Sequence, residues 1–226
     1  MRERPTLFNG DMVRAILEGR KTVTRRLVPA WQLPTELSRE EDDKLRWMSV
    51  AQRDPRWGFG VFGRTEAECM AQYNEDGPRC CPFGQPGDRL WVRETTEAFT
   101  SPCGAVELSR YSADGAPVLH PDLEGCEFSN AIAHWTYSRS TRPSIHMPRW
   151  ACRILLEVTA VRVERLHDIT LGEICKEGLA RSIYEFAPVQ RGFDAFADLW
   201  KSTGGDWDAN PWVWVIEFKR LESAHA

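Results

Sequence analysis

Two strand-like runs constrain the fold of this 226-residue chain most strongly. The longer covers residues 152–166 and is rich in Ile, Leu and Val, and its inward and outward positions change phase near Ala160, as at a β-bulge or bend. The other covers residues 211–221, where tryptophans alternate with valines. The remaining strand-like stretches are short and irregularly spaced. The pattern predicts an α+β fold built on a small β-barrel, not on a doubly wound sheet.

Two long stretches with little regular pattern interrupt these runs. Residues 28–83 contain five prolines, and we expect mostly loop and short helix there. Residues 99–149 are also irregular, with one strand expected at residues 134–137. We therefore expect a single domain over residues 1–226, in which these stretches are insertions and the core consists of residues 5–27, 84–98, 150–180 and 194–221.

Short helices are marked by their end signals. Asp11 is the expected N-cap of the first helix, and Gly19 follows its C-terminus. Thr170 and Glu173 have the spacing of a capping box, and Gly178 ends that second helix. An aromatic stripe predicts a third helix, through Phe193, Phe196 and Trp200.

The composition limits the classes of partner. The chain has 29 Lys and Arg against 33 Asp and Glu, and its net charge of −4 argues against a strong grip on duplex nucleic acid. The N-terminus lacks the apolar stretch of a signal peptide, and no apolar run approaches the length of a membrane span, so we expect a cytoplasmic protein without membrane contact. The seven cysteines are irregularly spaced without a C-x-x-C pair, so we expect reduced thiols, no metal and no cofactor.

Positive charge is nevertheless concentrated in the segment GRKTVTRR, residues 19–26. Arg20 and Lys21 directly follow a helix, where cations are favoured near the terminal carbonyl groups. Arg25 and Arg26 lie in a strand-like stretch and are explained equally well as solvated residues. The cluster therefore has a purely structural interpretation beside any functional one.

Two carboxylates break local rules. Glu177 lies at the C-terminal end of its helix, where the helix dipole disfavours it by roughly 0.3–1 kcal/mol. This makes it a candidate site residue, although a solvated Glu at a frayed helix end is an alternative. Glu94 lies on the apolar face of Leu90 and Val92 if their strand continues that far; otherwise the strand has already ended.

The segment RPSIHMPRW, residues 142–150, holds His146 between two prolines and two arginines. Such a histidine can border a site for an anion or a base, although a lone histidine is more often structural. We place His146, Trp150 and Glu94 in the expected wall of a binding cleft.

The pattern Gly19-x-Lys21-x-x-Thr24-x-Arg26 resembles the signature of the ASCH domain superfamily, a relative of the PUA RNA-binding fold. The segment RPSIHMPRW is similar to larger ASCH proteins encoded by phages and prophages. Further segments, in the order of the small bacterial ASCH proteins, are similar to that family: residues 87–92, 156–160 and 215–219. The resemblance covers the four core ranges given above.

The resemblance implies a compact PUA-like β-barrel flanked by helices, and a chemistry. One bacterial branch hydrolyses N(4)-acetylcytidine with a Lys–Thr–Glu set, which falls here on Lys21, Thr24 and Glu177. Thr24 would supply the nucleophile, Lys21 would accept its proton, Glu177 would orient Lys21 or activate water, and Arg26 would stabilise developing charge. Because alternate strand residues face opposite ways, this set requires Lys21 to precede the strand.

Two other functions fit the same residues. In a non-catalytic module that binds RNA or a nucleotide, Lys21, Arg25 and Arg26 would contact phosphate while a tryptophan stacks on a base. In a ribonuclease, the basic cluster would stabilise a phosphoryl transition state. All three hypotheses expect a modified nucleoside or RNA as the partner.

Overall fold

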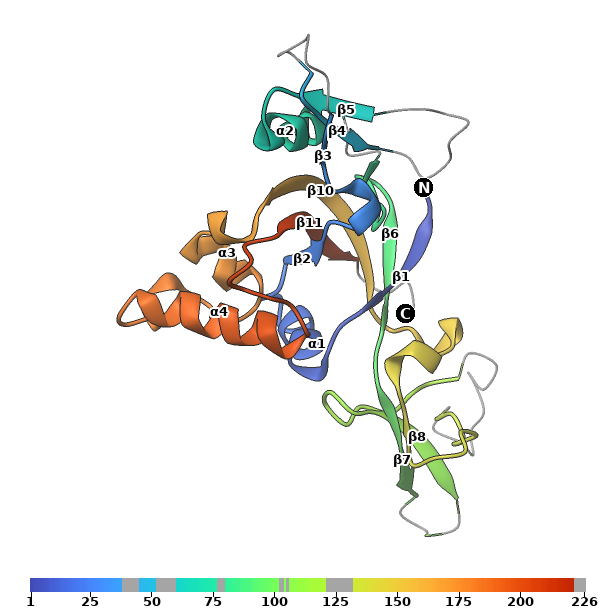
Figure 1. Ribbon diagram of the computed structural model, residues 1–226. Coiled ribbons are helices and arrows are strands. Elements are labelled where there is room, and N and C mark those ends of the chain that lie inside the picture. The colour runs from blue at the N-terminus through green and yellow to red at the C-terminus, as the bar shows by residue number, and fades with distance from the viewer. Residues whose placement is uncertain are drawn as a thin grey trace. The chain divides into compact units, whose positions relative to one another are not determined.

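The computed structural model describes residues 1–37, 45–51, 60–76, 80–101, 104, 106–120 and 132–221. Strands and four α-helices make up this part of the chain, which confirms the expected α+β class (Figure 1). The chain divides into two compact units. The first contains residues 1–2, 20–88 and 157–219, and the second contains residues 3–19, 89–156 and 220–226.

The largest sheet has five strands in the order β1-β6-β10-β11-β2. In the second unit β1 pairs with β6 in parallel, in the first β11 pairs with β2 antiparallel, and β10 runs through both units. Within the described residues no sheet closes into a barrel, and β1 and β2 are the edges of this one. The strands are β1 (Glu3–Leu7), β2 (Val23–Leu27), β6 (Arg89–Arg93), β10 (Leu155–Arg165) and β11 (Trp212–Leu221).

The phase change predicted in the longest strand is confirmed. Leu156 and Val158 are buried on one side of Ala160, and Val163 is buried beyond it. The buried positions therefore shift from even to odd residue numbers within β10, as a bend in a strand produces.

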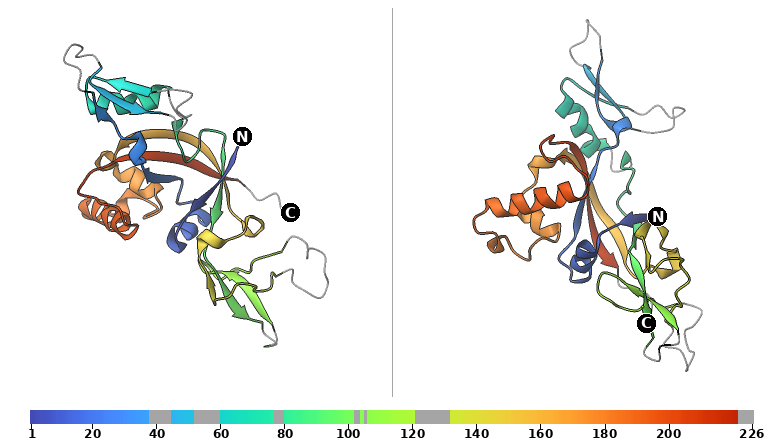
Figure 2. Two further views of the ribbon diagram at one scale, coloured as in Figure 1. Left: turned by 45° about the vertical axis from the view of Figure 1, so that its right-hand side comes forward. Right: turned by 60° about the horizontal axis from the view of Figure 1, so that its bottom comes forward.

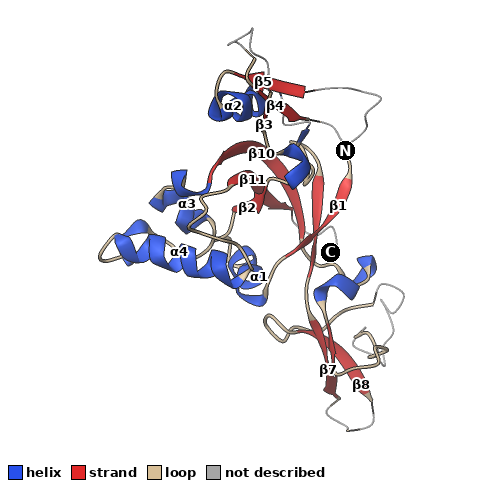
Figure 3. Ribbon diagram, viewed as in Figure 1, coloured by secondary structure: helices blue, strands red, loops and turns tan. Residues whose placement is uncertain are grey.

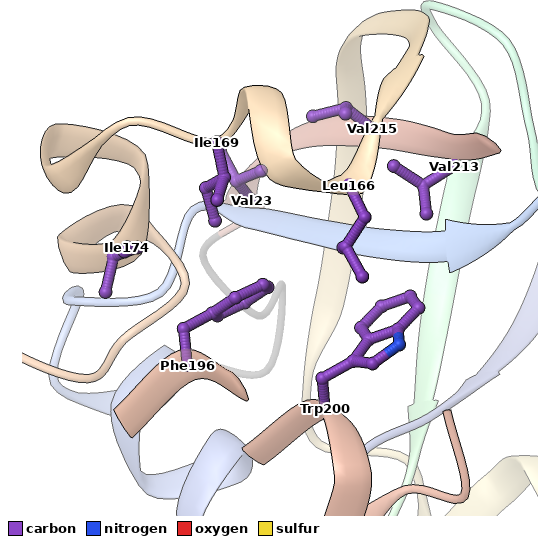
Figure 4. Packing of buried hydrophobic residues seen from close by; sticks show 8 residues of the cluster. All are labelled: Val23, Leu166, Ile169, Ile174, Phe196, Trp200, Val213 and Val215. Atoms are coloured by element: carbon purple, nitrogen blue, oxygen red, sulfur yellow. The ribbon is translucent and has the colours of Figure 1, made fainter. Parts of the chain in front are cut away.

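Two helices cover one face of β2 and β11 in the first unit. They are α3 (Leu171–Lys176) and α4 (Gln190–Ser202). The predicted capping box of α3 is present: Thr170 Oγ1 accepts from Glu173 N at 3.3 Å, and the Glu173 carboxylate accepts from Thr170 N at 3.0 Å. Figure 4 shows side chains of α4 pointing toward the strands. The buried cluster consists of Val23, Leu166, Ile169, Ile174, Phe196, Trp200, Val213 and Val215.

Helix α1 (Gly10–Leu17) begins earlier than its expected cap. Asn9, and not Asp11, is the N-cap, because the Asn9 side chain accepts a hydrogen bond from Met12 N at 2.9 Å. Asp11 lies in the first turn, where its charge suits the helix dipole. Gly19 follows the helix with a φ of 73°, as its glycine signal predicts.

The first expected insertion is more regular than loop and short helix. It contains an antiparallel sheet in the order β3-β4-β5, with helix α2 packed against it (Figure 2). Its strands are too short to give a clear alternation in sequence. The elements are β3 (Thr35–Glu36), β4 (Trp47–Val50), β5 (Gly60–Gly63) and α2 (Glu66–Asp76).

The second expected insertion contributes β8 and β9 to a sheet in the order β8-β7-β9, whereas β7 lies mostly in the expected core range 84–98. Figure 3 labels β7 and β8. The strand expected at residues 134–137 is wrong, because His134 makes only an isolated bridge to Leu108. The strands are β7 (Thr96–Thr100), β8 (Glu107–Tyr111) and β9 (Thr141–Arg142). None of the described helices combines the length and apolar character needed to cross a membrane.

Candidate functional site

Lys21 lies before the strand that holds Thr24. Strand β2 begins at Val23, so Lys21 lies in the turn before the strand and is not bound by strand alternation. Thr24 is the second residue of β2 and pairs with Ile216 of β11. Both side chains are buried.

The Lys21 ammonium group lies at the C-terminal end of α3. Its Nζ donates to Glu177 Oε2 at 2.5 Å, to the Glu177 carbonyl at 2.9 Å and to the Val23 carbonyl at 2.9 Å. These three bonds match the three N–H donors of an ammonium group. Burial lowers the Lys21 pKa, and the attraction of Glu177 opposes this change.

Glu177 is the C-cap of α3, and its side chain is only 4% exposed. Oε2 contacts Lys21, and Oε1 accepts from Arg25 Nη1 at 3.2 Å. Two cations from the segment 19–26 therefore compensate a carboxylate that the helix dipole disfavours. The interpretation of Glu177 as a solvated residue at a frayed helix end is wrong.

Arg25 is not a solvated strand residue either. Its guanidinium group contacts Glu164 at 2.7 Å and Glu173 at 3.1 Å, in addition to Glu177, and its side chain is 1% exposed. Sequence reasoning missed Glu164, and it assigned Glu173 only to the capping box. A buried arginine needs carboxylate partners, but nothing local indicates which ones.

The cations after α1 do meet helix-terminal carbonyls, but those of a different helix. Arg20 donates to the Gly178 carbonyl, and Lys21 donates to the Glu177 carbonyl. Both acceptors follow α3, and they lie 158 and 156 positions along the sequence from Arg20 and Lys21, respectively. The expected type of contact is therefore present with an unexpected partner.

Arg26 lies on the same face of β2 as Thr24, because both are one residue away from Arg25 in the strand. It pairs across the strands with Trp214. Burial lowers the Arg26 pKa, and the charge of Glu177 opposes that change. Glu177 thus acts electrostatically on both Lys21 and Arg26.

Glu94 belongs to the second unit and has its own partners there. Strand β6 ends at Arg93, yet the Glu94 side chain is 1% exposed, so both sequence interpretations are partly right. Its two oxygens accept from Arg153 at 2.6 and 3.0 Å, and Arg153 also contacts Asp114 at 2.8 Å. Burial raises the Glu94 pKa, and Arg153 opposes this. The position of Glu94 on an apolar face of the sequence pattern indicated that it has a partner, but it did not indicate that the partner is Arg153.

His146 and Trp150 also lie in the second unit, and both are exposed. His146 ends the 3₁₀ turn Ser144–His146 and lies 6.0 Å, between ring centroids, from Tyr137. Trp150 lies in the turn Arg149–Ala151, with its ring 4.7 Å from that of His120.

Within the described residues, no three side chains of His, Cys, Asp or Glu gather closely enough to hold a metal ion. We compared the chain with protein-family models, curated proteins and solved structures, and none of these comparisons gave a match.

Proposed function

We propose that this chain is an ASCH protein with a PUA-like fold that hydrolyses the amide of an acylated nucleobase such as N(4)-acetylcytidine. The contact that carries the proposal is the buried 2.5 Å approach of Lys21 Nζ to Glu177 Oε2, directly before the strand that holds Thr24. The segments of the family resemblance also coincide with regular elements, which are β2, β6, β10 with α3, and β11.

The chemistry needs a lysine that can accept a proton. The Lys21 ammonium group donates three hydrogen bonds. In this protonated form its nitrogen has no lone pair that could accept the Thr24 proton. Proton transfer across the contact to Glu177 leaves Lys21 neutral and the charge of the pair unchanged, and burial favours this neutral form. Arg25 favours the charged form by its bond to Glu177 Oε1, so the neutral pair is the minor, reactive one.

The reaction then runs in two halves. Thr24 Oγ1 attacks the acyl carbon as its proton passes to Lys21, while Arg26 stabilises the oxyanion. The C–N bond breaks, the leaving amine takes up the proton, and the acyl group remains on Thr24. Water, deprotonated by the same pair, attacks this ester and releases the carboxylic acid, which restores the Thr24 hydroxyl group.

Burial of the cations favours hydrolysis over phosphate binding. Lys21 and Arg25 are each buried and already paired with carboxylates. A phosphate contact would have to break these ion pairs in a poorly hydrated environment, which is costly. The alternatives of RNA binding or RNA cleavage by this cluster are therefore less well supported.

The decisive experiment is a chromatographic assay of the purified protein with N(4)-acetylcytidine and related acylated bases. We expect Thr24→Ala to lower kcat/KM at least about 100-fold, while Thr24→Ser keeps part of the activity. Turnover by wild type that survives in Thr24→Ala would contradict the assigned nucleophile. The absence of turnover with any acylated base, from folded wild-type protein, would contradict the proposed reaction.

Two Glu→Gln variants test whether Glu177 accepts the Lys21 proton. Glu177→Gln keeps the shape of the side chain but cannot take the Lys21 proton, so we expect a loss comparable to that of Thr24→Ala. Glu36→Gln is the control, because Glu36 forms an exposed ion pair with Arg46 in the same unit. Equal effects of the two substitutions on kcat/KM would argue against a role for Glu177.

A further inference from the structure

The segment of residues 132–150 in the second unit has an unusual charge for this chain. It contains Arg139, Arg142 and Arg149 but no Asp or Glu, although the chain as a whole has 33 acidic residues. The motif RPSIHMPRW forms its second half, and the proposed hydrolysis gives no role to the arginines and aromatic residues of this segment.

Arginine and aromatic side chains stack on one another along this segment. The Arg142 guanidinium carbon lies 5.2 Å from the ring centroid of Trp135 and 5.2 Å from that of Tyr137. Tyr137 in turn lies 6.0 Å from His146. All four side chains are partly or fully exposed, so the stack is accessible from solvent.

A second stack joins the same segment through hydrogen bonds. Arg93 lies over the ring of Trp91 at 5.2 Å and donates from Nη2 to the carbonyl oxygens of Ile145 and Met147. Arg149 also lies over that ring, at 5.7 Å. We define the aromatic–arginine surface as the set Arg93, Trp135, Tyr137, Arg142, His146 and Trp150. Trp150 belongs to neither stack, but it is exposed and follows Arg149 directly in this segment.

The two arginines of this surface differ from Arg149, which is paired with Glu3 at 2.9 Å. Among the described residues, neither Arg93 nor Arg142 pairs with a carboxylate. Arg110, elsewhere in the same unit, also lies over an aromatic ring, that of Phe99, but it is paired with Glu97 at 2.7 Å. The positive charges of Arg93 and Arg142 therefore favour an anionic partner.

We infer that the aromatic–arginine surface binds single-stranded nucleic acid. Exposed aromatic rings and guanidinium planes stack on unpaired bases, and the arginines neutralise phosphates. Duplexes fit poorly, because their bases are already stacked and the net charge of −4 disfavours a broad electrostatic grip. This inference rests on residues of the second unit and does not depend on hydrolysis at Lys21.

Fluorescence anisotropy with dye-labelled oligonucleotides of about 10–15 nucleotides tests the inference at low salt. We expect single-stranded RNA or DNA to bind more tightly than a duplex of the same sequence. Arg142→Ala and Trp150→Ala should each weaken binding about fivefold or more. Arg110→Ala is the matched control and should leave the affinity unchanged.

Two further variables refine the test: the salt concentration and the sugar of the oligonucleotide, ribose or deoxyribose. Arg142→Ala should also reduce the dependence of affinity on salt, whereas Trp150→Ala should not, because only the arginine displaces a counterion. Tighter binding of RNA than DNA would show that the 2′-hydroxyl group is read, and equal binding would show that stacking and phosphate contacts suffice; both support the inference. Equal losses in Arg110→Ala and Arg142→Ala, or no binding of either strand by folded protein, would overturn it. The anisotropy experiment measures binding and needs no turnover. Its result can therefore be interpreted even if the hydrolysis assay shows no activity.

Discussion

At the scale of single residues, the buried Tyr73 hydroxyl group in the first unit has hydrogen-bond partners. The Tyr73 hydroxyl group lies 2.6 Å from Ser49 Oγ and donates to the Val50 carbonyl at 3.0 Å. Its ring packs edge-on against Trp214, with 5.5 Å between the centroids. Burial raises the Tyr73 pKa to about 12, although the bond to Ser49 opposes this change.

Tyr73 should make the stability of the protein fall at high pH. An unfolded tyrosine ionises near pH 10, about two units below folded Tyr73, so its contribution is complete below pH 10 and is lost as the pH rises to about 12. We expect the wild type to be more stable than Tyr73→Phe by about 1 kcal/mol at neutral pH. Above pH 10 this difference should shrink by up to about 1.4 kcal/mol per pH unit.

Denaturant unfolding at a series of pH values measures this difference. Tyr184→Phe is the control, because Tyr184 is 88% exposed and loss of its hydroxyl group should change the free energy of unfolding little. A Tyr73→Phe difference that stays constant up to pH 12 would show that the phenol ionises in the folded protein as easily as in water.

At the scale of elements, the packing of α2 on β5 depends on Gly63, which has no side chain. A Cβ atom added at Gly63 would lie 2.4 Å from the Cys69 backbone nitrogen and 2.9 Å from the Cys69 Cα atom. Backbone atoms cannot rotate out of the way, so the helix and the strand would have to separate. Cys69 is itself fully buried, and its Sγ lies 3.3 Å from the Val61 carbonyl oxygen.

We expect Gly63→Ala to lower the free energy of unfolding by about 1–3 kcal/mol. Gly60→Ala, in the same strand, should cost clearly less, because the nearest atom to its added Cβ is the Ser49 carbonyl oxygen at 3.3 Å. Urea denaturation of the two variants and the wild type provides the comparison. A Gly60→Ala cost equal to or above that of Gly63→Ala would contradict this account of the α2 packing.

At the scale of the whole molecule, each unit has a hydrophobic core of its own. In the first unit Phe196 and Trp200 of α4 meet the strands, and in the second unit Met147 packs with Tyr111. Strand β10 contributes residues to both units. Separate cores allow separate cooperative units of unfolding.

Core truncations should therefore act unit by unit. We expect Phe196→Ala to cost about 3–5 kcal/mol and Met147→Ala about 2–5 kcal/mol. In native-state hydrogen exchange, Phe196→Ala should weaken protection mainly for amides of the first unit, and Met147→Ala mainly for those of the second. If each variant weakened both units equally, the chain would unfold as one cooperative whole.

Features with local signals could be predicted from the sequence. The capping box of Thr170 and Glu173, the glycine after α1 and the phase change in β10 depend on residues only a few positions apart. The sheets in the two expected insertions could not be predicted, because strands as short as β3 are stabilised by pairing with distant residues and not by their own propensity. Residues 39–44 form a run of charged residues in the sequence, and this run lies outside the described residues.

The same division holds for the candidate site. The sequence by itself determined which residue types stand at Lys21, Thr24 and Glu177, and that Glu177 breaks a local rule. Only the tertiary structure decided that Lys21 meets Glu177 across 156 positions of sequence, or that Glu94 meets Arg153. The physical reason is that ion pairs and hydrogen bonds depend on distances of a few ångströms in space, and the folded backbone sets those distances for residues far apart in the chain.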